Sequence, residues 1–220
     1  TGVLTFSYLV RKNLPDDSPD AEDLDLVIRE TKRCASIIHR LLDFSREKTP
    51  EKAFTNLNSI IEDTVQLVAQ AAQVNNIDIK TDLDEELPAI WLDENLVKQV
   101  IMNMLVNAQH AIEGEGHIGI KTRLIDTSDC PESMEKPGDV AEITITDTGS
   151  GIPEGDLQRI FDPFFTTKGV GKGTGLGLSV SHGTIEAHGG LIEVESTVGK
   201  GTEFRIYLPV NRPEDGGSNA

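Results

Sequence analysis

Residues 147–177 contain three short segments whose residue types could together bind a nucleotide. An alternating apolar stretch ends at Asp147, which begins the run Asp-Thr-Gly-Ser-Gly; residues 161–165 read Phe-Asp-Pro-Phe-Phe, and residues 173–177 read Gly-Thr-Gly-Leu-Gly. A carboxylate at a strand end can accept a hydrogen bond from an exocyclic amine, and glycines let the backbone approach a ligand closely. Amides at the start of a helix favour phosphate. Each segment alone is weak evidence, but their order predicts a nucleotide-binding site.

A fourth segment, residues 99–110, places two asparagines on one face of a predicted helix. Asn103 and Asn107 are one helical turn apart. Asparagine is a poor helix former, so a pair on one face needs an explanation, either a solvated helix face or a bound ligand. Gln99 and His110 extend this polar stripe. The apolar stripe of the same helix consists of Val97, Ile101, Met104, Leu105, Ala108 and Ile112.

In this order the four segments resemble the ATP-binding catalytic domain of two-component sensor histidine kinases. The resemblance covers nearly the whole chain to about Pro209, and residues 1–48 are similar to part of that family's dimerisation and phosphoacceptor hairpin. It implies an ATP-dependent protein-histidine kinase with ATP and Mg²⁺ as cofactors. Such an enzyme transfers the γ-phosphoryl group to a histidine of its own homodimer, for relay to an aspartate in the receiver domain of a response regulator.

The resemblance also implies roles for individual residues. Asn107 would coordinate Mg²⁺, and Asn107 and Lys168 are the expected catalytic residues. One neutral protein ligand suffices, because Mg²⁺ keeps several waters and takes most other oxygens from the phosphates. Asp147 would accept a hydrogen bond from the adenine amino group. The full set expected to contact the nucleotide is Asn103, Asn107, His110, Asp147, Gly149, Gly151, Ile152, Phe165, Thr167, Lys168, Gly173, Thr174, Gly175, Leu176, Gly177 and Thr202.

Several of these residues, or the segments around them, need a separate comment on the role that the resemblance implies. His110 occupies a position where many family members carry Lys or Arg to touch phosphate. Residues 161–174 resemble the ATP lid, in which Lys168 is the best-placed cation for the β- or γ-phosphate. Phe161 and Phe164 are equally well explained as core aromatics. Thr202 is expected to join the adenine site through water.

The family's phosphoacceptor is a histidine followed directly by an acidic residue. The chain has five histidines, and the residues that follow them are not acidic: His39-Arg40, His110-Ala111, His117-Ile118, His182-Gly183 and His188-Gly189. We therefore expect the acceptor to lie upstream of residue 1, and this fragment to be unable to phosphorylate itself. His39 is interpreted as a surface or packing residue of the second bundle helix.

The chain divides by pattern into four parts. Residues 1–48 read as a partial helical hairpin whose two adjacent heptad stripes predict a four-helix bundle in a homodimer. Residues 49–53 read as a linker, residues 54–210 as the ATP-binding domain and residues 211–220 as a disordered tail. Helices are predicted at 58–75, 93–113 and 175–188, and strands at 77–81, 117–125, 140–146, 191–197 and 202–208. This order predicts an α+β fold, an α/β sandwich with helices on one face of a mixed sheet.

The net charge and the cysteine content limit the kinds of partner and compartment that we expect for this chain. The net charge of −17 argues against nucleic acid and against direct contact with an anionic membrane, which both attract basic proteins. It also means that Mg²⁺, local cations and oriented amides must offset the field around a triphosphate. Cys34 and Cys130 lack metal-ligand spacing and read as reduced thiols, which is typical of a cytoplasmic protein. A membrane anchor of a longer parent would lie outside these residues.

Two other classes of function share some of these features. An ATPase of the chaperone, topoisomerase or mismatch-repair type, or a serine kinase of the same fold, usually has Glu where Asn103 stands. A nucleotide-binding dimerisation module or pseudokinase would bind ATP without transferring phosphate. Asn107, Asp147 and the second glycine segment argue against that last interpretation.

Overall fold

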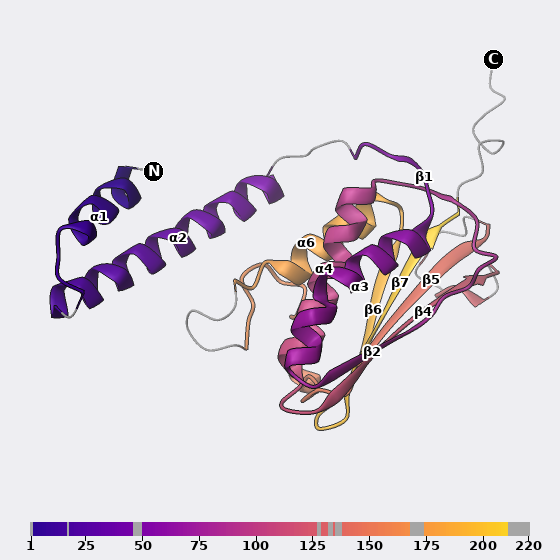
Figure 1. Cartoon of the computed structure of the whole chain (residues 1–220). Coiled ribbons are helices and arrows are strands. Elements are labelled where there is room, and N and C mark those ends of the chain that lie inside the picture. The colour runs from indigo at the N-terminus through magenta and orange to yellow at the C-terminus, as the bar shows by residue number, and fades with distance from the viewer. Residues whose placement is uncertain are drawn as a thin grey trace, which may run out of the picture. The chain divides into compact units, whose positions relative to one another are not determined.

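The computed structural model describes residues 2–16, 18–45, 50–126, 129–131, 134, 138–167 and 174–210, with the side chains of residues 33 and 36–45 excepted. The chain forms two compact units, residues 1–48 and residues 49–220. Figure 1 shows both units, and each is described by itself.

The first unit is a helical hairpin. Helix α1 (Gly2–Lys12) packs against helix α2 (Pro19–Ser45), and the turn between them is fixed by the Ser18 hydroxyl, which accepts from the Ala21 amide at 3.1 Å. The Arg11 guanidinium, which lies 3.0 Å from both Asp16 and Asp25, joins the turn and the second helix to the first. Ala21 and Ile28 are buried between the helices. Large apolar side chains remain exposed on both: Val3, Phe6, Leu9, Val10, Leu26 and Val27.

The second unit is a five-stranded mixed sheet in the order β2-β4-β5-β7-β6. Its strands are β2 (Ile77–Asp82), β4 (Gly116–Ile125), β5 (Val140–Asp147), β6 (Leu191–Thr197) and β7 (Gly201–Pro209). Strands β2 and β4 are parallel, and the remaining pairs are antiparallel. Helices α3 (Leu57–Val74), α4 (Glu94–Ala111) and α6 (Gly177–Ala187) cover one face, as Figure 1 shows. This confirms the predicted α+β fold.

The core lies between the sheet and these helices. Along β5, Ile143 and Ile145 are buried because alternate side chains point to the same face of a strand. Every residue of the predicted apolar stripe of α4 is buried as well, from Val97 to Ile112. Burying a large aliphatic side chain stabilises a fold by about 1.5–3 kcal/mol. The hydrophobic contact with the sheet therefore fixes the rotation of α4, and with it the direction of its polar face.

The structure adds elements that the sequence pattern did not predict. Strands β1 (Ala53–Thr55) and β3 (Ile90–Leu92) pair as a two-stranded antiparallel sheet, and α5 (Glu154–Leu157) is a single short turn. Ala53 thus belongs to a strand, although residues 49–53 were expected to be a linker. The Glu51 amide donates to Asp93 Oδ2 at 2.8 Å, which attaches this segment to the domain. The expected tail, residues 211–220, lies outside the described residues.

Candidate nucleotide-binding site

Asp147 ends strand β5 at the centre of the sheet. Its Oδ1 accepts from the Gly149 amide at 2.8 Å, and the Thr202 amide of β7, its partner in the strand register, also bonds to the carboxylate. Burial raises the pKa of Asp147 above its ordinary value, and these two amides oppose that shift. The carboxylate is therefore a half-buried acceptor held by backbone donors on both sides.

The first glycine segment packs against the end of helix α4. The Ser150 amide donates to the Ala111 carbonyl at 2.8 Å, and a Cβ at Gly149 would lie 2.7 Å from Ala111 backbone atoms. No side chain fits at such a distance, so glycine is required for this approach. The contact places Asp147 and its loop beside the last turn of α4, one turn beyond Asn107.

The turn between β6 and β7 covers the other side of the same segment. The Gly199 amide donates to the Ser150 carbonyl at 2.8 Å. Gly151 has φ +70°, and a Cβ there would lie 2.2 Å from the Thr197 carbonyl oxygen; Gly201 has φ +117°, and a Cβ there would lie 1.8 Å from the Asp147 carbonyl oxygen. Both glycines are needed for their backbone conformation and for the close approach.

The asparagines of α4 lie next to helix α6. Asn103 Nδ2 donates to the Gly177 carbonyl and to Ser181 Oγ, at 3.3 Å each, so it joins α4 to the start of α6. Asn107 is half-buried one turn later, and His110 is exposed beyond it. The structure thus brings the asparagine face of α4 together with the second glycine segment, as a shared nucleotide site requires.

The Phe segment meets the second glycine segment through its backbone. The Phe164 amide donates to the Gly175 carbonyl at 2.9 Å. Phe161 and Phe165 pack against the core, whereas Phe164 is 58% exposed. Thr167 is exposed, and Leu176 is buried at the start of α6. The predicted cation Lys168 and the predicted nucleotide contact Gly173 lie outside the described residues.

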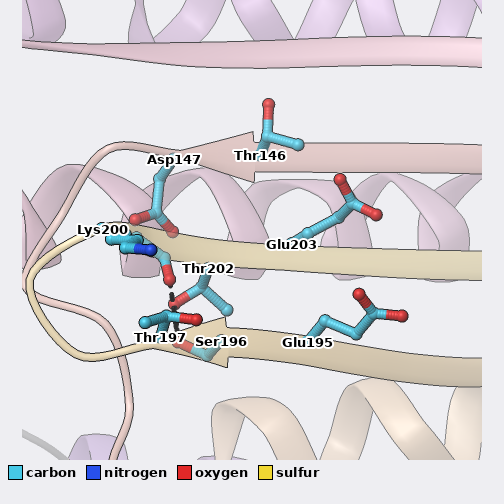
Figure 2. Close-up of a pocket in the computed structure, with 9 residues that line it drawn as sticks. Thr146, Asp147, Glu195, Ser196, Thr197, Lys200, Thr202 and Glu203 are labelled. Carbon is cyan, nitrogen blue, oxygen red and sulfur yellow. Dashed lines mark hydrogen bonds between the residues drawn. The ribbon is translucent and has the colours of Figure 1, made fainter.

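A pocket of about 230 Å³ opens at the ends of β5, β6 and β7. Figure 2 shows the side chains that line it, including Asp147, Thr202 and Ser196. Thr146, Glu195 and Glu203 also line it from the face opposite the helices, since their strand neighbours Ile145, Val194 and Phe204 belong to the core. Glu195 and Glu203 both pair with Arg205. Of the residues predicted to contact a nucleotide, this pocket includes only Asp147 and Thr202.

Ser196 is a site residue that sequence reasoning missed. Its hydroxyl lies 2.8 Å from the Ile152 amide, 2.9 Å from the Gly201 carbonyl and 3.0 Å from Thr202 Oγ1. It therefore connects the first glycine segment to the β6–β7 hairpin. The alternation of β6 could have predicted that Ser196 lies on the core side of the strand with Ile192 and Val194. It could not have predicted the three hydrogen-bond partners.

The donor chemistry of the described residues fits a magnesium nucleotide better than a protein-only metal centre. The described part of the chain holds no group of three His, Cys, Asp or Glu side chains able to bind a metal ion. Asn107 offers a neutral amide oxygen, which suits a hard cation whose other ligands are waters and phosphate oxygens.

Among the described helices, none is both long and apolar enough to cross a membrane.

The chain is similar in sequence to sensor kinases. Residues 92–212 match the family described as histidine kinase-, DNA gyrase B- and HSP90-like ATPase. The chain is 40% identical over 211 residues to the signal transduction histidine-protein kinase AtoS of Escherichia coli, covering 96% of this chain and 32% of AtoS. It is 37% identical over 212 residues to the sensor kinase CckA of Brucella abortus, covering 95% of this chain and 22% of CckA. The chain therefore spans about a third or less of these relatives.

Solved structures agree with the sequence match. The nucleotide-free catalytic domain of histidine kinase ThkA superposes with a TM-score of 0.62 at 32% identity, covering 73% of this chain and 96% of that domain. A second structure of ThkA, in complex with the response regulator TrrA, superposes with a TM-score of 0.68 at 26% identity, covering 95% of this chain and 57% of that chain. The chain belongs to the histidine kinase-, DNA gyrase B- and HSP90-like ATPase family, and it contains the catalytic ATP-binding domain of a sensor histidine kinase.

Proposed function

We propose that this chain binds Mg-ATP and transfers its γ-phosphoryl group to a histidine of a homodimer, from which the group passes to an aspartate of a response regulator. The supporting observation is the convergence of three segments. Asn103 bonds to Gly177 at the start of α6, Ser150 bonds to Ala111 at the end of α4, and Asp147 lies at the strand end beside that contact.

In this proposal Asp147 selects adenine. An ionised carboxylate can only accept hydrogen bonds. The exocyclic amine of adenine is a donor, whereas the corresponding oxygen of guanine is an acceptor and would be repelled. The Gly149 and Thr202 amides hold the carboxylate in position before a ligand arrives.

The phosphates would lie along α4 towards the start of α6. Phosphoryl transfer depends mainly on positioning and on charge stabilisation. Bound Mg²⁺ would neutralise the β- and γ-phosphate oxygens, and Asn107 is the residue proposed to hold it. The amides of Gly175 and Gly177 at the helix start are proposed to favour the phosphate charge. Lys168 is proposed as the second catalytic residue, and His110 as a weaker phosphate contact.

The partners follow from the same proposal. The exposed apolar side chains of α1 and α2 suit association with a second copy into a four-helix bundle. ThkA has been solved in complex with the response regulator protein TrrA, which supports a receiver domain as the downstream partner of this chain.

Binding is tested first, by titration calorimetry with a non-hydrolysable ATP analogue. Asn107→Ala should weaken binding only when Mg²⁺ is present, and Asp147→Asn should weaken it with or without Mg²⁺. Two matched controls should bind normally. Gln109→Ala removes an amide on another face of α4 that donates to the Val68 carbonyl of α3. Asp82→Asn alters an exposed strand-end carboxylate. Unchanged affinity in both site variants would refute the assignment.

Transfer is tested next, with labelled Mg-ATP and a separate helical-hairpin polypeptide that carries a histidine followed by an acidic residue. The expected product is an acid-labile phosphohistidine on that polypeptide, lost in Asn107→Ala. Tight ATP binding without any transfer would favour a nucleotide-binding module instead.

A further inference from the structure

We infer that Ser196 determines nucleotide specificity by fixing the direction of the Thr202 hydroxyl, so that Thr202 can only accept hydrogen bonds at the adenine site. This inference rests on the proposed ATP site and adds a positioning residue to it.

The argument begins with the hydrogen-bonding capacity of one hydroxyl. A serine hydroxyl has one proton to donate and two lone pairs to accept with. Ser196 Oγ has three partners in the structure: the Ile152 amide at 2.8 Å, the Gly201 carbonyl at 2.9 Å and Thr202 Oγ1 at 3.0 Å. Figure 2 shows Ser196 beside Thr202 in this arrangement.

Two of these partners have fixed roles. The Gly201 carbonyl can only accept, so it takes the single proton of Ser196. The Ile152 amide can only donate, so it occupies one lone pair. The remaining lone pair of Ser196 faces Thr202 Oγ1, and the Thr202 hydroxyl must donate its proton there. All capacity of Ser196 is then used.

This arrangement fixes what Thr202 can offer to a ligand. Its proton is committed to Ser196, so the lone pairs of Thr202 Oγ1 are what remain for other partners. Thr202 lies directly opposite Asp147 in the strand register, and its side chain is buried. Asp147 and Thr202 together present only acceptors at this position. A donor in direct contact fits them, namely the adenine amine, and the guanine oxygen in the same place does not.

Removing Ser196 would release this constraint. The Thr202 hydroxyl could then rotate and donate directly to the guanine oxygen. We expect Ser196→Ala to lower the ratio of ATP-analogue affinity to GTP-analogue affinity by about three- to tenfold, the scale of one net hydrogen bond. Thr202→Val should lower the same ratio, because it removes the acceptor.

The deciding measurement is a double-mutant cycle on that ratio, by titration calorimetry with non-hydrolysable ATP and GTP analogues in Mg²⁺. If Ser196 acts through Thr202, the double variant Ser196→Ala with Thr202→Val should match Thr202→Val alone. The inference would be overturned if the double variant lowered the affinity ratio by the product of the two single-variant factors. It would also be overturned if Ser196→Ala left the ratio unchanged. A wild-type chain that binds neither analogue would instead refute the proposed ATP site.

Control variants separate specificity from general damage. Thr64→Val removes a buried hydroxyl that donates to the Ile60 carbonyl at 2.6 Å within α3, and it should leave the ratio unchanged. If Ser196→Ala does not fold, Ser196→Cys keeps the size of the side chain while a thiol bonds only weakly. It should lower the ratio in the same direction, and a wild-type ratio in Ser196→Cys would contradict the inference.

Discussion

Phe164 and Gly175 meet through their backbones, with the Phe164 amide donating to the Gly175 carbonyl at 2.9 Å. Both residues have positive φ, 69° at Phe164 and 65° at Gly175. A Cβ on Gly175 would lie 2.3 Å from the Phe164 carbonyl carbon. This contact holds Phe164 against the middle of the second glycine segment, immediately before the helix that meets Asn103.

Gly175→Ala is expected to destabilise the domain and to weaken ATP-analogue binding. The new Cβ cannot fit unless the Phe164 backbone moves, and the left-handed conformation adds about 1–2 kcal/mol of its own. Gly199→Ala is the matched control, since Gly199 also has positive φ, 78°, but has open space around the added Cβ. Urea denaturation of both variants should show the larger loss for Gly175→Ala by at least about 1 kcal/mol. Equal losses would mean that the close approach to Phe164 has no energetic importance.

Nucleotide binding should weaken in acid because the Asp147 carboxylate becomes protonated. Its pKa lies above the ordinary value of 3.8, mainly because of burial, so the carboxyl becomes protonated at a higher pH than an exposed aspartate would. A protonated carboxyl loses an acceptor. We therefore expect the affinity of wild type for an ATP analogue to fall, as pH is lowered, already above pH 3.8.

The same shift predicts the effect of Asp147→Asn on stability. A pKa raised in the folded state means that folding disfavours the charged form, so this group stabilises the fold at low pH and that contribution is lost as pH rises through the raised pKa. At neutral pH the neutral amide should leave the apo domain at least as stable as wild type while binding of the ATP analogue is weakened. A melting temperature well below wild type would show that the carboxylate is needed for folding rather than for the ligand.

The sequence predicted the long, periodic elements of this fold and missed the short ones. Helix α4 is 18 residues long, and its apolar repeat identified a stripe that proves to be buried throughout. Strands β1 and β3 have three residues each, too few for a period to be visible, and they pair across residues 53–55 and 90–92. Their pairing depends on where the rest of the domain places them.

The candidate site likewise contains residues that the sequence could predict and residues that it could not. Residues whose type suggests the chemistry, such as Asp147 and Asn107, were predicted from their motifs, and their roles stay predictions. Ser196 was not, because its role depends on three partners from two other parts of the chain. The close approach of Gly149 to Ala111 is likewise visible only in three dimensions.

The first unit should cause dimerisation without being needed to fold the second. The units are compact separately, and the second contains the five-stranded sheet and its helices. We expect light scattering to find residues 1–220 as a dimer at micromolar concentration and residues 51–220 as a monomer. The shorter chain should keep the ATP-analogue affinity of the longer one. A monomeric full chain would refute the proposed bundle.

Stability should fall in mild acid because of His188, which is buried where α6 meets the start of α4. Its Nδ1 lies 2.7 Å from the Thr184 carbonyl and donates to it, while Nε2 accepts from the Asp93 amide at 3.0 Å. The ring is therefore neutral, and a proton on Nε2 would break the bond to Asp93. Burial is the main reason that its pKa lies below 6.5, with Lys52 adding to the shift and Asp93 and the Thr184 carbonyl opposing it.

The sign of the pH effect follows from this lowered pKa. Below about pH 6.5 the unfolded chain binds a proton at His188 that the folded chain does not, so the free energy of unfolding should decrease as pH falls from 6.5 towards the folded pKa. Urea midpoints at pH 7.5, 6.5 and 5.5 measure this slope. His188→Gln should flatten it, because an amide can replace both hydrogen bonds without titrating. Thr64→Val, at a buried hydroxyl that does not titrate, should keep the wild-type slope. An equally steep slope in His188→Gln would show that other groups cause the acid sensitivity.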